Sequence, residues 1–160
     1  MTRRFGDRDT FAVEVGEVES PHLRTVDLWA AGTQLTTDDN SAYVPSLLAA
    51  MRSTAARVRQ RHVPACPFPG RSPEDVFRLL EQDGTEFRER FWFLQWGEIL
   101  DNVPRYAYLD GDLVLVFSFW RPTHPLPDDL GAIFVATIAP DEFVATVLAA
   151  ADLLDVEPVR

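Results

Sequence analysis

Apolar and polar residues alternate near the start of the chain, which is the pattern of half-buried strands. In residues 11–18, three apolar side chains share one face and an acidic side chain lies on the other: Phe11, Val13 and Val15 against Glu14. The turn-forming residues 20–22 lead into a second apolar stretch at 23–31, and Gly32-Thr33 permits a reversal into a short strand near 34–35. The pattern predicts an antiparallel hairpin with a short third strand, and we expect the residues before it to fray.

A helical period follows over residues 44–61. The apolar side chains of this segment fall within an arc of about 100°: Val44, Leu47, Leu48, Met51, Ala55 and Val58. Its arginines lie outside that arc: Arg52, Arg57, Arg59 and Arg61. Three prolines within residues 63–70 then predict a rigid, non-helical connection. Ser72 as N-cap and Pro73 in the first turn predict a second helix, which we expect to end near Asp83-Gly84.

The second half of the chain is rich in β pattern. The aromatic segment 91–97 is typical of a strand, with a helical turn through Phe87 and Phe91 as the alternative. Asp110-Gly111-Asp112 predicts a tight turn between strands at 106–109 and 113–121.

Both faces of residues 113–121 are apolar. This strand is therefore expected to be central, covered on both sides or lying at an interface with a second subunit. A third strand at 132–139 and a final helix from Pro140 complete the pattern. The order of elements predicts the α+β class. We expect one domain over residues 1–160, with a single antiparallel sheet of about five to six strands packed with three helices.

Composition agrees with a globular domain. The chain has 160 residues, of which 46% are hydrophobic and 25% charged. Its one cysteine, Cys66, forms no internal disulfide, and the residues after Met1 do not resemble a secretory leader. No apolar run approaches the ~20 residues that span a bilayer. We expect a cytoplasmic protein that binds no membrane.

Charge is strongly acidic and unevenly distributed. The net charge is −10, and it divides into −4 over residues 1–39, +5 over 40–73 and −11 over 74–160. All 15 basic residues are arginine. An acidic surface disfavours binding to nucleic acid, because affinity there comes from neutralising phosphates.

Recognisable catalytic and metal motifs are absent. The sequence has no phosphate-binding glycine loop, nucleophile elbow or paired-cysteine motif. His62 and Cys66 lack further soft ligands nearby, so we expect no metal site and no cofactor. His124, in a proline-rich segment that ends at Asp128-Asp129, is the one imidazole next to carboxylates. A small enzyme or ligand-binding domain with a cleft near His124 is therefore the alternative function, and a rigid loop for partner recognition is another role for this segment.

Aromatic residues and carboxylates alternate in the acidic second half. Most of the aromatic side chains suit a core, but a carboxylate rim around one or two exposed rings would suit binding of a basic protein. The residues that we expect to face a partner are Trp96, Glu98 and Asp101, followed by Asp128 and Asp129.

Two stretches together resemble a known family. Residues 5–14, leading to 26–32, contain a Gly-Asp start, a Phe-Ala-Val-Glu strand and a Trp-x-x-Gly strand end. Trp96-Gly97-Glu98 and Asp101-Asn102-Val103 form a later Trp-Gly and Asp-Asn element. The pattern resembles bacterial polymorphic-toxin immunity proteins, most nearly the immunity protein 42 group.

The resemblance implies a small intracellular protein, without catalytic activity, that binds a cognate toxin domain and blocks its active site. Acidity suits a basic, nuclease-like toxin, since carboxylates can occupy the place of phosphates. The expected partner is a protein toxin, and the chain itself is expected to be a monomer or a homodimer.

Overall fold

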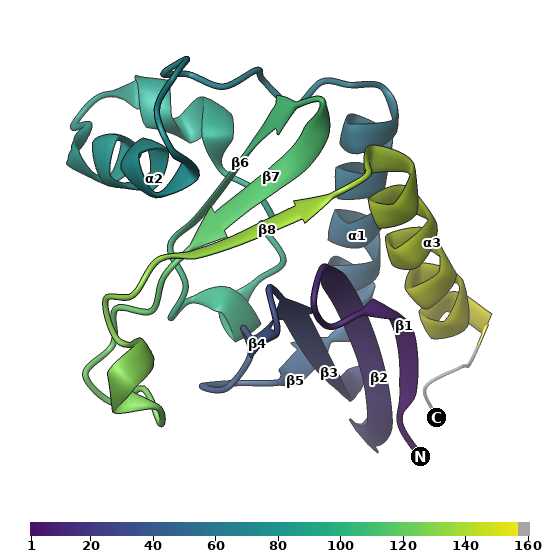
Figure 1. Ribbon diagram of the computed structural model, residues 1–160. Helices are drawn as coiled ribbons and strands as arrows, with labels where there is room; N and C mark the ends of the chain where they lie inside the picture. Colours follow the sequence, from purple (N-terminus) through teal and green to yellow (C-terminus); the bar gives the residue numbers. More distant parts are fainter. Residues whose placement is uncertain (157–160) are drawn as a thin grey trace.

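The computed structural model describes residues 1–156, which form two antiparallel sheets, three α-helices and three short 3₁₀ helices (Figure 1). Sheet A contains β1 to β5, and sheet B contains β6 to β8. The strands of sheet A are β1 (Arg3–Asp7), β2 (Phe11–Ser20), β3 (Leu23–Ala30), β4 (Thr33–Gln34) and β5 (Ser41–Tyr43). Those of sheet B are β6 (Arg105–Asp110), β7 (Asp112–Phe117) and β8 (Phe134–Ile138). The helices are α1 (Val44–Arg59), α2 (Pro73–Gln82), η1 (Glu86–Phe91), η2 (Glu98–Leu100), η3 (Pro127–Asp129) and α3 (Pro140–Val156).

The α+β class and the three helices are confirmed, but the strands do not form one sheet. In sheet A the order is β1-β2-β3-β4, with β5 pairing β3, whereas sheet B has the order β6-β7-β8. No strand of one sheet pairs with a strand of the other within residues 1–156. The long helical excursion between β5 and β6 carries the chain into another layer, so the second group of strands pairs only with itself.

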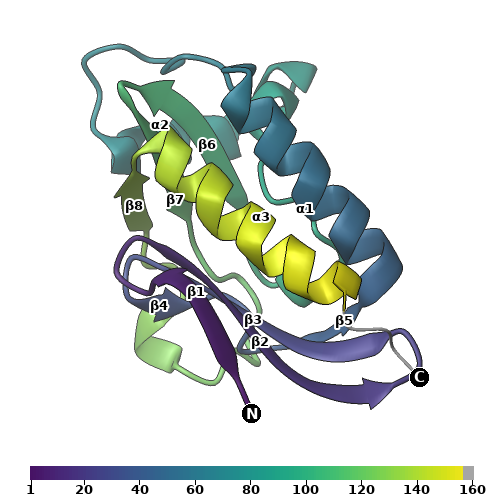
Figure 2. The ribbon, with the colours of Figure 1, turned by 90° about the vertical axis from the view of Figure 1, so that its right-hand side faces the viewer.

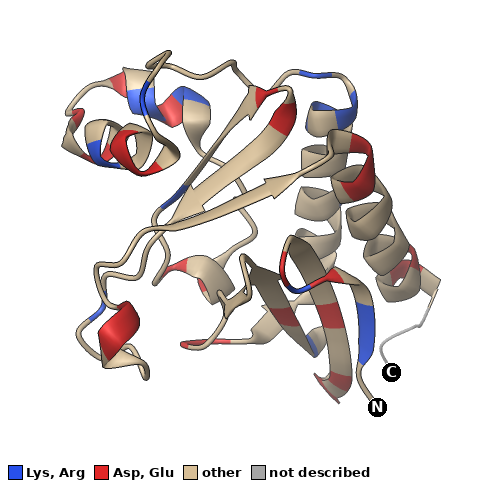
Figure 3. Cartoon of the chain, in the orientation of Figure 1, with Lys and Arg blue, Asp and Glu red and all other residues tan. Residues whose placement is uncertain are grey.

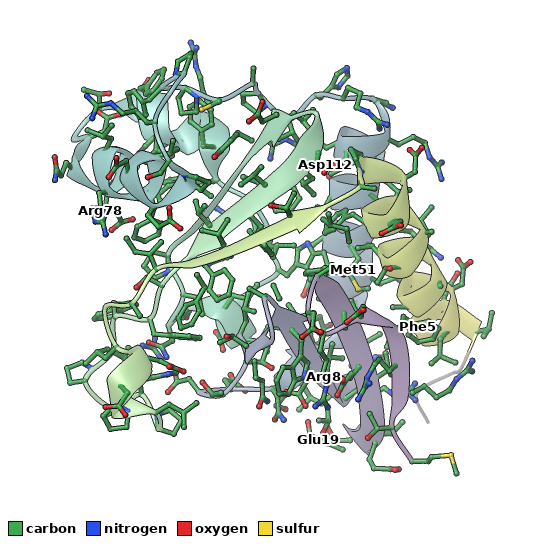
Figure 4. The ribbon with its side chains drawn as sticks, in the orientation of Figure 1. Phe5, Arg8, Glu19, Met51, Arg78 and Asp112 are labelled. Atoms are coloured by element: carbon green, nitrogen blue, oxygen red, sulfur yellow. The ribbon has the colours of Figure 1, made fainter. Side chains whose placement is uncertain are left out.

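Helices α1 and α3 lie side by side and cover one face of sheet A (Figure 2). The alternation predicted for β2 and β3 supplies the apolar face beneath them, including Val13 and Leu28. Met51 points from α1 into this layer (Figure 4) and is fully buried. The apolar stripe predicted for residues 44–61 is thus the buried side of α1, which ends at Arg59.

The prediction for the two-sided strand is confirmed, because β7 is the middle strand of sheet B. Its residues Leu113, Leu115 and Phe117 join the main core. Val114 and Val116 face the other way and join a second cluster with Val76, Phe77 and Leu80 of α2. Elements of the same chain therefore cover both faces of β7.

The first residues do not fray, contrary to expectation. They form β1, which pairs with β2 from Arg3↔Val15 to Asp7↔Phe11. Gly6 lies near the end of β1 with a φ of +87°. Residues with a Cβ atom rarely adopt this backbone conformation, so glycine permits the tight turn into β2. The strand was not predicted because its polar residues carry no clear alternation.

The strand expected at 91–97 is also absent. The chain instead makes η1 and then an irregular stretch, in which Leu94 and Gly97 have positive φ. Arg105 fixes this stretch by donating to the carbonyl oxygens of Leu94, Leu100 and Val103 at 2.8 to 3.1 Å. Burial lowers the pKa of the Arg105 guanidinium to about 10. One half-buried side chain thus binds the Leu94 carbonyl, which a strand would present to a neighbour, together with two carbonyls beyond residue 97.

No helix within residues 1–156 is both long and apolar enough to cross a membrane.

Candidate functional site

Trp96, the aromatic residue expected to face a partner, lies in the core. It is 4% exposed, and its indole packs edge-on against Phe11 with ring centroids 6.2 Å apart. Its Nε1–H donates to the Thr54 hydroxyl at 2.9 Å, so the polar atom of the ring is also satisfied internally. Trp96 therefore packs against β2 and α1 from the segment before η2, and it is almost entirely buried.

The acidic residues expected beside it do reach the surface. Glu98 and Asp101 belong to the short turn of η2, and Asp128 and Asp129 belong to η3. Two further carboxylates, Asp38 and Asp39, lie on the loop between β4 and β5. We call these six residues the acidic corner. Their three segments lie at the same end of the molecule (Figure 3).

Arg121 links two sides of the acidic corner. Its guanidinium forms an ion pair with Asp38, and its second terminal nitrogen lies 4.0 Å from the Asp101 carboxylate. Among the described residues, the corner thus combines six carboxylates with the guanidinium of Arg121, and the Arg105 guanidinium also interacts with Asp101. The surplus of negative charge persists after the internal pairing.

Trp120 is the exposed aromatic residue of the corner. Its side chain is 57% exposed, and its Nε1–H donates to the Asp101 carbonyl oxygen at 2.9 Å. The bond holds the indole in place while leaving much of the ring in water. Leu126 and Leu130, 51% and 40% exposed, lie in the same segment of chain. An exposed aromatic ring, with exposed aliphatic residues in the same segment of chain, is therefore present at Trp120 and not at Trp96.

A hollow of about 390 Å³ opens between the two loops of the corner. One wall is the segment that includes Thr36, Thr37, Asp38 and Asp39, and the other is Pro125-Leu126. Polar acceptors therefore face an apolar wall, an arrangement that suits a side chain with an aliphatic stem and a cationic head. A second hollow of about 270 Å³ lies between Tyr43 of β5 and Glu98 of η2.

His124 lies beneath the first hollow and does not line it. It is 4% exposed, and its ring stacks on Phe119 with centroids 4.0 Å apart. Its Nδ1 lies 3.1 Å from the Asn102 amide nitrogen and 3.5 Å from the Thr37 hydroxyl. Within residues 1–156, no carboxylate contacts the imidazole, and its neighbours are the neutral side chains of Asn102, Thr37 and Phe119.

Sequence reasoning located the acidic segments of η2 and η3 but missed Trp120, Arg121 and the Asp38-Asp39 loop. The sequence pattern predicts that Trp120 belongs to a strand, but that strand ends at Phe117. Pro122 was the available signal, because a proline so close to Trp120 disfavours its place in a central strand. The Asp38-Asp39 loop approaches Arg121 only through the fold, so nothing in its local pattern marks it.

No group of three or more potential metal ligands gathers among the described residues. No family model, no curated protein and no solved structure matches this chain. The site is therefore interpreted from its own geometry.

Proposed function

We propose that this chain is an immunity-type protein, which binds a basic toxin domain through the acidic corner and thereby neutralises it. The observation that carries the proposal is Trp120, an exposed indole whose N–H is bound by the Asp101 carbonyl oxygen, next to the Arg121 that pairs with Asp38. Large aromatic residues that are already ordered before binding lose little entropy on association. Surrounding charge speeds encounter with an oppositely charged partner and disfavours other partners.

Electrostatics supports a basic partner rather than nucleic acid. The carboxylates of the corner would repel phosphates but could replace them in the substrate groove of a nuclease-like toxin. The hollow beside Leu126 would receive an arginine or lysine side chain, with its stem along Pro125-Leu126 and its head near Asp39.

The alternative, a small enzyme or ligand-binding domain, has weaker support. A hollow does lie near His124, but the imidazole contacts Asn102 and Thr37 instead of a carboxylate. The imidazole is buried and does not line the hollow, which lends the alternative less support.

Affinity capture from the native cell, followed by co-expression, tests the proposal. The chain should capture a basic protein domain that arrests growth when expressed alone, and co-expression of the chain should restore growth. A captured partner whose toxicity is unchanged by co-expression would overturn the proposal.

Two substitutions at the corner sharpen this experiment. Trp120→Ala should weaken binding at least about tenfold, as expected for an anchor at an interface centre. Phe87→Ala, which also truncates a partly exposed ring but lies on η1, should leave binding unchanged. Equal effects of both variants would place the interface elsewhere.

Charge reversal tests the electrostatic part. Asp128→Arg should lower the association rate and its dependence on salt, because it removes attraction at long range. Glu142→Arg makes the same charge change at an exposed position of α3 and should affect the rate much less. An association rate that is insensitive to salt would contradict the electrostatic mechanism.

A further inference from the structure

We infer that His124 is a positioning residue of the acidic corner, active in its neutral form, and that protonation of its imidazole loosens the corner. The conformational part of this inference concerns the chain alone. Its consequence for binding rests on the proposed function.

The orientation of the Asn102 amide determines which nitrogen of His124 carries the proton. The backbone N–H of Arg121 donates to Asn102 Oδ1 at 2.9 Å. Since that N–H can only donate, the amide must direct its oxygen toward Arg121 and its NH₂ group toward His124. The Asn102 NH₂ group then donates to His124 Nδ1 at 3.1 Å, so Nδ1 has no proton. The structure assigns the neutral tautomer with hydrogen on Nε2.

This set of contacts joins three segments that carry the corner. Thr37 precedes Asp38 and Asp39, Asn102 follows Asp101, and His124 precedes η3. The Asn102 carbonyl oxygen also accepts a hydrogen bond from the backbone N–H of Trp120 at 3.3 Å. The exposed indole, the two acidic loops and η2 are therefore held in register around one buried imidazole.

Protonation is incompatible with these contacts. A proton on Nδ1 would face the Asn102 NH₂ group, which is itself a donor, and only the more distant Thr37 hydroxyl at 3.5 Å could accept it. Rotating the amide would satisfy the imidazolium but would direct NH₂ toward the Arg121 N–H. Either the bond to His124 or the bond to Arg121 must be lost.

Charged groups near the ring offer an imidazolium no direct partner. The elements packed against it contribute Asp38 and Asp39 from the loop after β4, Asp101 and Arg105 from the segment after η2, and Arg121 from its own segment. Asp38 is already paired with Arg121, and Arg105 donates to backbone carbonyls. Within the described part of the chain, Nε2 is buried and its N–H has no hydrogen-bond partner in either protonation state, so the added charge of an imidazolium gains no compensating bond there.

The test uses the full chain in a background where His124 is the sole histidine. His22→Gln and His62→Gln remove the other two imidazoles, both at exposed positions. Nitrogen NMR of the ring should show hydrogen on Nε2 at pH about 7.5. The pH is then lowered stepwise while the protonation of the ring nitrogens is followed by the same measurement. The exchange protection factor of the Arg121 amide should fall about tenfold as the ring gains a proton.

Asn102→Asp provides the decisive variant. A carboxylate accepts from both the Arg121 N–H and a proton on Nδ1, so this variant should retain amide protection when His124 is protonated. Three outcomes would overturn the inference: hydrogen on Nδ1 at neutral pH, a ring that stays neutral throughout, or unchanged protection while the ring titrates. Equal loss of protection in Asn102→Asp and its parent would also overturn it.

Binding measurements separate this inference from the proposed function. If acidification loosens the free chain and speeds dissociation of the captured toxin, with Asn102→Asp resisting both effects, both proposals hold. If the free chain loosens but the toxin dissociates at an unchanged rate, the positioning role survives and the assignment of the acidic corner as the interface fails.

Discussion

Gly6 shows how a single residue sets the geometry of the first hairpin. A Cβ atom there would lie 2.3 Å from the Phe11 carbonyl oxygen and 2.8 Å from Thr146 Cγ2. Gly131 has a similar positive φ of +79°, but nothing lies within 4 Å of its Cβ position. We expect Gly6→Ala to lower the free energy of unfolding by about 2 kcal/mol more than Gly131→Ala, because it adds a clash to the backbone strain that both share. Urea denaturation of the two variants measures this difference, and equal losses would contradict it.

Tyr108 makes stability depend on pH in the alkaline range. Burial in the cluster under α2 raises the pKa of its hydroxyl to about 12, from an ordinary value of 10.0. The folded state therefore retains a proton that the unfolded state loses. Its contribution to stability is complete below pH 10 and disappears as the pH rises through about 12. Burial also raises the pKa of Tyr106, with a further contribution from its bond to Glu81, so both residues act in the same direction.

The urea concentration at the midpoint of unfolding should fall between pH 10 and about 12 in the parent chain. In Tyr108→Phe this fall should be smaller, because the ring remains but carries no hydroxyl proton to lose. Tyr43→Phe, at an exposed position on β5, should leave the fall as it is in the parent chain. An unchanged slope in Tyr108→Phe would show that this hydroxyl contributes nothing to the alkaline transition.

At the scale of elements, α2 depends on a local signal that the sequence already displays. The Ser72 hydroxyl accepts the Asp75 N–H at 3.1 Å, as its N-cap position predicts. Ser72→Ala should cost about 1 kcal/mol of unfolding free energy. Ser53→Ala, at an exposed interior position of α1, should change it by less than about 0.5 kcal/mol. Thermal melts of the two variants compare them directly, and equal shifts would contradict the capping role.

At the scale of the whole molecule, sheet B joins two hydrophobic clusters. Met51 lies in the main core and Leu80 lies in the cluster under α2, while alternate residues of β7 enter both clusters. We therefore expect one cooperative unfolding transition. Met51→Ala and Leu80→Ala should each lower stability by about 2 to 5 kcal/mol and shift that same transition. Calorimetry would contradict this by showing two transitions, only one of which moves in Leu80→Ala.

The candidate site was only partly predictable from the sequence, and particular residues show why. Glu98, Asp101, Asp128 and Asp129 are polar residues in turns, so their exposure follows from local composition. Trp96 and Trp120 both adjoin strand-like segments, and no local pattern says which ring is buried. Contacts with Phe11 and Thr54, distant along the chain, place Trp96 inside.

The sequence by itself determined the α+β class, the stripe of α1, the cap of α2 and the two-sided burial of β7. Each of these depends on periodicity or on neighbouring residues. Only the tertiary structure decided that the strands divide into two sheets, that residues 91–97 form no strand, and that Trp120 rather than Trp96 is exposed. These outcomes depend on contacts between distant segments, such as those of Arg105, Asn102 and His124, whose partners a local pattern does not encode.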